Sequence, residues 1–186
     1  KYELNPDMLV IADAEKPVAI AGVMGGEYSG VLDSTKDVVI EAAFFNKTSV
    51  RMTSAKLNLS SEASHRYERG ADIGMVEKAS ARAAALILEL AGGELVSDLV
   101  SVAEPQPAQP RILCRYARIR SLLGMDVSDL EISTIFSKLG MEVEPVNAES
   151  CYVIPPTYRA DVLEEADLAE EVARIHGLDN IPDVPV

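Results

Sequence analysis

The densest group of side chains able to do chemistry lies near the end of the sequence, where residues 159–177 read RADVLEEADLAEEVARIHG. Residues three and four apart are neighbours on a helix, so Asp167, Glu170 and Glu171 would share one face. Asp161 stands just before that helix. Clustered carboxylates suit a hard cation such as Mg²⁺, which prefers oxygen ligands. A solvated acidic helix face explains the same pattern, and both interpretations stay open.

A second candidate site lies in the first half, where MGGEYSG (24–30) precedes VVIEAAFF (38–45). The backbone at Gly25 and Gly26 can approach a ligand because no Cβ blocks it. No Lys follows, so this is not a phosphate loop. Glu41 interrupts an apolar run, where an unpaired carboxylate is costly. Either these residues form a turn and a solvent-facing strand edge, or they line a pocket for a small ligand with a hydroxyl or ammonium group.

Hydroxyl and charged side chains also gather in residues 60–70, SSEASHRYERG. A nucleophilic pair of Ser61 or Ser64 with His65 can be imagined. Side chains so close in sequence rarely face each other productively, so a catalytic triad is not expected. A salt-bridged loop that supports a site is the preferred interpretation, and the arginines here could contact phosphate.

Composition narrows the class of protein. The 186 residues are 48% hydrophobic and 25% charged, with a formal net charge of −13, which indicates a packed chain and disfavours nucleic-acid binding by the whole surface. Four arginines within ten positions still leave a local nucleic-acid contact open: Arg111, Arg115, Arg118 and Arg120.

The expected compartment is the cytoplasm. No apolar run reaches the length of a membrane span, and the first residues do not read as a signal peptide. Cys114 and Cys151 lie outside any CxxC pair, which excludes a zinc ribbon or a thioredoxin-type site. Two buried free thiols are predicted in a reducing environment.

The proline-rich stretch AEPQPAQP predicts a linker at 103–110 between domains at 1–102 and 111–186. Apolar runs and helical periodicity then give the elements. In the first domain we expect strands at 8–12, 18–23, 38–43 and 95–102 and a helix at 72–91. In the second we expect strands at 112–114, 141–145 and 152–154 and helices at 116–123, 128–139 and 163–176. The predicted fold class is α+β, a mixed-sheet domain followed by a small winged-helix-like domain.

Three of these motifs together resemble the beta subunits of bacterial phenylalanine–tRNA ligase: GGEYSG ahead of VVIEAAFF, SSEASHRYERG, and PPTYRADVLEEADLAEEVARIHGLDNIP. The resemblance runs through essentially the whole chain. It implies part of the B3/B4 editing domain, then the linker, then the B5 domain. It also implies a parent α2β2 ligase that uses ATP and Mg²⁺ to attach phenylalanine to its tRNA, with ATP bound elsewhere. The parent would hydrolyse tyrosine wrongly esterified to that tRNA.

The resemblance assigns roles to particular residues. It implies an editing pocket in which a glutamate reads the tyrosine hydroxyl, with small and hydroxyl residues around it: Gly25, Gly26, Glu41, Ser61 and Ala63. It implies Mg²⁺ ligands shared with the alpha subunit: Asp161, Asp167, Glu170 and Glu171. Many relatives have Thr at the position of Ser61.

No side-chain nucleophile is inferred, and a positioned water is the simpler agent of hydrolysis. The family's pocket also uses a histidine from a preceding segment, so the chain alone is expected to be inactive. Two other functions remain: a structural subunit-interaction module without catalysis, and a winged-helix nucleic-acid binder.

Overall fold

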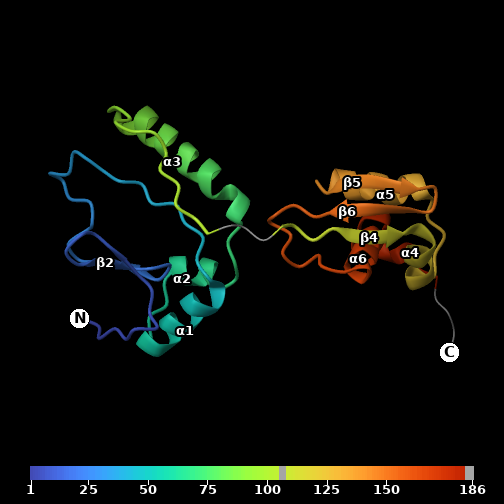
Figure 1. The fold of residues 1–186 in the computed structure, drawn as a ribbon, viewed down its shortest axis with the longest axis horizontal. Coiled ribbons are helices and arrows are strands. Elements are labelled where there is room, and N and C mark those ends of the chain that lie inside the picture. Colours follow the sequence, from blue (N-terminus) through green and yellow to red (C-terminus); the bar gives the residue numbers. More distant parts are fainter. Residues whose placement is uncertain (105–107, 183–186) are drawn as a thin grey trace. The chain divides into compact units, whose positions relative to one another are not determined.

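The computed structural model describes residues 1–104 and 108–182, and the chain divides after Leu99 into two compact units (Figure 1). The linker predicted at 103–110 includes residues 105–107, which lie outside the described residues. Each unit combines helices with a small three-stranded sheet, which confirms the predicted α+β class. None of the helices in the described ranges has both the length and the apolar character needed to cross a bilayer.

The sheet of the first unit contains β1 (Val10–Ala12), β2 (Pro17–Ile20) and β3 (Met24–Gly25), paired in that order. The strands predicted at 8–12 and 18–23 pair as a hairpin, with Val10 opposite Ile20. The prediction of a mixed sheet is wrong for the described residues, because both pairings are antiparallel. Connections this short can only join antiparallel neighbours, since a parallel pair needs a long crossover.

Three longer helices follow in the first unit: α1 (Lys47–Leu57), α2 (Glu62–Tyr67) and α3 (Val76–Ala91), the last preceded by a short 3₁₀ turn, η1 (Ile73–Met75). The helix predicted at 72–91 is confirmed. The first two were missed because their sequences are polar, and their caps define them better than apolar periodicity does. The Asn46 side chain accepts the amides of Thr48 and Ser49 at the start of α1.

Two predicted strands are absent from the first unit. Residues 38–43 and 95–102 carry strand-like apolar runs, yet neither is paired among the described residues. Their side chains are largely in water, and Val39 is 98% exposed. A strand is stable only when a neighbouring strand satisfies its backbone groups, and no described segment does so here. The core of this unit is small, with Val23, Val50 and Leu59 at its centre.

The second unit runs β4 (Ile112–Arg115), α4 (Tyr116–Leu123), α5 (Asp129–Lys138), β5 (Glu142–Asn147), β6 (Ser150–Ile154), α6 (Glu165–His176) and a final 3₁₀ turn, η2 (Leu178–Asn180). All six predicted elements of this unit are present. The strand order is β4-β6-β5, antiparallel throughout. Helix α5 is capped by Ser128, whose hydroxyl accepts the Glu131 amide at 3.2 Å.

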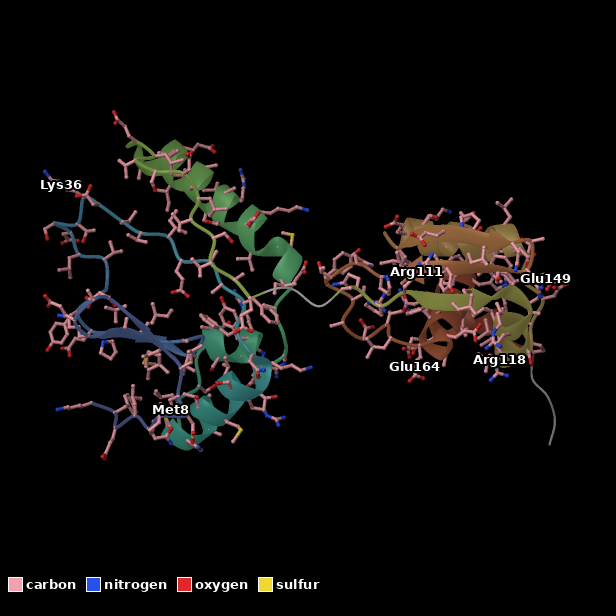
Figure 2. All side chains as sticks on the ribbon, in the orientation of Figure 1. Met8, Lys36, Arg111, Arg118, Glu149 and Glu164 are labelled. Carbon is pink, nitrogen blue, oxygen red and sulfur yellow. The ribbon has the colours of Figure 1, made fainter. Side chains whose placement is uncertain are left out.

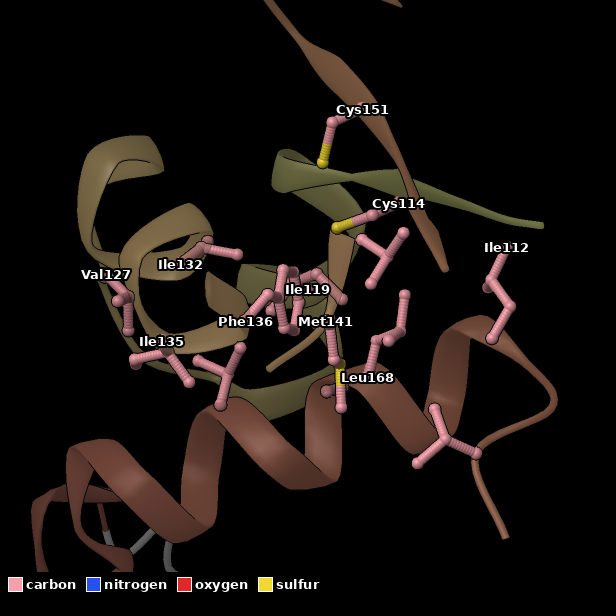
Figure 3. Close-up of a cluster of buried hydrophobic side chains, with 14 of the residues drawn as sticks. Ile112, Cys114, Ile119, Val127, Ile132, Ile135, Phe136, Met141, Cys151 and Leu168 are labelled. Carbon is pink, nitrogen blue, oxygen red and sulfur yellow. The ribbon is translucent and has the colours of Figure 1, made fainter. Parts of the chain in front are cut away.

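The core of the second unit lies between this sheet and its helices. Side chains from β4, β6, α4, α5 and α6 interdigitate there, including Ile119, Phe136 and Leu168, each fully buried (Figure 3). Cys114 and Cys151 are directly opposite each other on β4 and β6, and both are buried free thiols, as predicted. Burial, followed by the neighbouring Cys151, raises the pKa of Cys114. The second unit therefore has a large, well-packed hydrophobic core, whereas the core of the first unit is small.

Candidate functional site

The glycine-rich turn of the first unit folds back onto β2. The Gly26 amide donates to the Val18 carbonyl at 2.8 Å. A Cβ at Gly26 would lie 2.4 Å from that same carbonyl oxygen, so only glycine fits. A Cβ at Gly25 would meet nothing within 4 Å. Gly26 is therefore a requirement of the turn, whereas Gly25 borders open space in which a ligand could lie.

Ser61 ties helix α2 to Val23, the residue just before the glycine-rich stretch at 24–30. Its hydroxyl donates to the Val23 carbonyl at 2.5 Å and accepts the Ser64 amide at 3.0 Å. The Ser64 hydroxyl in turn accepts the Ser61 amide, which completes a capping box. Because the Ser61 proton is already donated to a carbonyl, these bonds argue against a nucleophilic serine. Ala63 is exposed in the first turn of α2.

Glu41 lies in an irregular segment that also contacts α2. Glu41 as a whole is exposed to solvent. Its carboxyl group is nevertheless partly shielded from water, and this desolvation raises the pKa of the carboxyl above its usual range. Burial, together with the charge of Glu41, also raises the pKa of Tyr67. Glu41 and Tyr67 are therefore close enough to interact electrostatically.

Sequence reasoning missed Tyr67, together with Phe45 and Gly22. The Tyr67 hydroxyl donates to the Ala43 carbonyl at 3.2 Å, and its ring lies 5.1 Å from the ring of Phe45. A Cβ at Gly22 would come within 3.0 Å of Phe45. No local pattern reveals these long-range contacts.

A cavity of about 370 Å³ also lies in the first unit, between residues 6–10 and α1. None of the five predicted pocket residues lines it. The described contacts join the segments of the predicted residues only in pairs, Ser61 with Val23 and Tyr67 with Ala43.

In the second unit, arginines occupy two of the four predicted metal ligands. Arg159 contacts Glu171 through two nitrogens, at 2.8 and 2.9 Å, and Asp161 through two more bonds, at 2.9 and 2.7 Å. Arg174 adds a further ion pair with Glu171. Hydrogen bonds from Arg159, helped by Arg174 and opposed by burial, lower the pKa of Glu171 to about 2. Glu171 is thus ionised and already neutralised.

The other two predicted ligands, Asp167 and Glu170, are not paired with these arginines in the described contacts. One oxygen of Asp167 accepts the amides of Leu163 and Glu164, both at 2.8 Å, and so caps α6. Glu170 is exposed. Within the described ranges, no three His, Cys, Asp or Glu side chains come together in a way that could hold a metal ion. As arranged, these residues do not fit a metal site made by this chain alone.

The arginines considered for nucleic-acid contact are mostly paired with carboxylates. Arg111 pairs with Glu144, Arg115 with Glu165 and Arg120 with Asp129. Figure 2 shows Arg111 and Arg118 well apart on the second unit rather than in one patch. A paired guanidinium must give up its carboxylate to bind phosphate, so this arrangement does not favour a nucleic-acid surface.

Comparison with known proteins agrees with this division into units. Residues 1–92 match the family described as B3/4 domain, and residues 112–178 match the tRNA synthetase B5 domain. A phenylalanine–tRNA ligase beta subunit from Yersinia pestis is 43% identical over 188 residues, covering 100% of this chain. Those from Desulfotalea psychrophila and Shewanella oneidensis are 44% and 47% identical over 98% and 96% of it. The chain belongs to the phenylalanine–tRNA ligase beta-subunit family.

The chain spans less than a quarter of these relatives, 23% of the first and 22% of the other two. The matched segment nevertheless contains every residue predicted for the editing pocket and for the Mg²⁺ ligands, because it covers both domains.

Proposed function

We propose that the parent protein is a phenylalanine–tRNA ligase and that the first unit of this chain forms part of its editing pocket. The substrate would be tyrosine wrongly esterified to the phenylalanine tRNA. The observation that supports this proposal is that helix α2 is bonded at both ends: Ser61 bonds the Val23 carbonyl, two residues before Gly25, and Tyr67 bonds the Ala43 carbonyl, two residues after Glu41.

This arrangement suits discrimination between tyrosine and phenylalanine, which differ by one hydroxyl. A site built to bond a hydroxyl rejects the analogue that lacks it, because its polar group would be left unpaired. A carboxyl that is partly shielded from water also bonds a phenol more strongly than one in bulk solvent. The partial burial of Glu41 supports that role, and the open space at Gly25 supports room for a ligand there.

Hydrolysis would then proceed by attack of a water molecule on the ester carbonyl carbon. The ester bond to the tRNA breaks, which releases tyrosine and a free tRNA 3′ end. Ser61 holds the turn through Val23 and supplies no nucleophile. The contribution of this unit is orientation of the ester.

The test uses the intact ligase with both subunits. Glu41→Ala should slow release of tyrosine from the mischarged tRNA by about tenfold or more, since a hydrogen bond to a charged group contributes about 1.5–3 kcal/mol. Charging with phenylalanine should persist. Glu89→Ala, at an exposed glutamate of α3, is the matched control. Unchanged deacylation in Glu41→Ala would refute the editing proposal.

For the second unit, we propose contact with the synthetase alpha subunit and a Mg²⁺ ion held only with ligands from that subunit. The chain's own carboxylates support this shared arrangement rather than a self-contained site. Asp161 and Glu171 are held by Arg159, and Glu170 is left exposed on α6.

A further inference from the structure

The segment that carries Glu41 needs an anchor. Residues 37–46 have no helix or strand, so no ladder of backbone bonds fixes the direction of the Glu41 side chain. Tyr67 holds this segment at two points. Its hydroxyl bonds the Ala43 carbonyl at 3.2 Å, and its ring packs against Phe45 with centroids 5.1 Å apart and planes tilted by 60°. These contacts come two and four residues after Glu41.

Tyr67 is itself held in place by helix α2. It is the last residue of α2, and the first turn of that helix is bonded to the glycine turn through Ser61 and Val23. Its ring also lies over the backbone of Gly22, where a Cβ would come within 3.4 Å of it. Helix α2 therefore links the glycine turn at one end to the Glu41 segment at the other.

The electrostatics favour a permanent donor at this position. Burial, and then the negative charge of Glu41, raise the pKa of the Tyr67 phenol. The hydroxyl therefore keeps its proton at neutral pH and can donate a hydrogen bond to the Ala43 carbonyl.

We propose that Tyr67 is a positioning residue for Glu41 in the discrimination of tyrosine from phenylalanine esters. It acts through the Ala43 carbonyl and the Phe45 ring, not by touching the substrate. This inference rests on the proposed editing function, so the experiment must separate the two.

The test compares Tyr67→Phe with the unaltered ligase, again with both subunits present. Release of tyrosine from the mischarged tRNA should fall about 3- to 10-fold, the size of one hydrogen bond. Hydrolysis of the phenylalanine ester should be unchanged, so the preference for the tyrosine ester falls with it. Tyr158→Phe is the matched control. It removes a tyrosine–carbonyl bond of the same 3.2 Å length, to Leu139 in the second unit.

A double variant distinguishes positioning from general support. If Tyr67 acts through Glu41, adding Tyr67→Phe to Glu41→Ala should cause no further loss. An equal loss in both backgrounds would overturn the inference, as would a Tyr67→Phe ligase that keeps its full preference. If Glu41→Ala itself has no effect, the proposed function fails first. Phe45→Leu, which spares the hydroxyl bond, should shift the preference in the same direction and guards against a misfolded Tyr67 variant.

Discussion

At the scale of single residues, Gly26 leaves the least room for a Cβ among the described glycines. Gly26→Ala would place a methyl group 2.4 Å from the Val18 carbonyl oxygen, so the turn or β2 must move. We expect a loss of about 1–3 kcal/mol in the free energy of unfolding. Thermal unfolding of the chain measures it, with Gly30→Ala as control, because a Cβ there meets nothing within 4 Å. Equal melting temperatures for the two variants would contradict the close approach.

The residues of the candidate site were predictable to different degrees. The pair of glycines signals a close backbone approach in the sequence itself, and the structure shows one at Gly26. The bond from Ser61 to Val23 was not predicted, because it spans 38 positions and leaves no local pattern in the sequence. Tyr67 was also invisible, since its partner is the Ala43 carbonyl, and every residue has a carbonyl.

At the scale of elements, α6 depends on ion pairs of its buried Glu171. Arg159 and Glu171 have side chains only 19% and 6% exposed, so removing one leaves the other poorly solvated. Arg159→Met should cost about 2 kcal/mol. Arg174→Met, at a side chain 50% exposed, should cost clearly less. Urea unfolding of the second unit measures both, and a reversed order would contradict the account.

The same pairs set a pH dependence. The pKa of Glu171 falls from 4.5 to about 2 on folding. The stabilisation is therefore fully present above pH 4.5 and is lost as the pH falls toward 2. Glu171→Gln should flatten the fall in melting temperature over that acid range. An unchanged acid profile in this variant would show that other carboxyls govern it.

Helices were predictable from the sequence where residues within the helix itself determine it. The amphipathic helix α3 and the capped helix α5 carry their signals in their own sequences. The apolar runs at 38–43 and 95–102 do not form strands, because pairing depends on a neighbour elsewhere in the chain. The spacing of the acidic residues on α6 did not reveal that Glu171 is paired with Arg159, which lies outside the helix, and with Arg174 within it.

At the scale of the whole molecule, the two units differ in self-sufficiency. The second has a continuous core drawn from all its strands and helices but η2. The first leaves much apolar surface in water, including Leu90 of α3, which is 81% exposed. The relatives are more than four times as long as this chain. We expect residues of the kind that the relatives have beyond the matched segment to pack against this apolar surface.

Metal binding also belongs to this scale. Because Arg159 and backbone amides engage three of the four carboxylates, the chain alone should show no saturable Mg²⁺ binding by calorimetry. The intact ligase should bind Mg²⁺, and Glu170→Gln in it should weaken that binding. Stoichiometric Mg²⁺ binding to the separate chain, lost in Glu170→Gln, would contradict a shared site.

The facing thiols of Cys114 and Cys151 have a practical consequence. Both side chains are 0% exposed, and a protonated thiol reacts poorly with alkylating reagents. They become reactive only when the sheet separates from the helices. The rate at which a small alkylating reagent labels these two cysteines therefore reports how often the second unit opens. The same labelling rate could be measured for each variant of that unit, without introducing another cysteine.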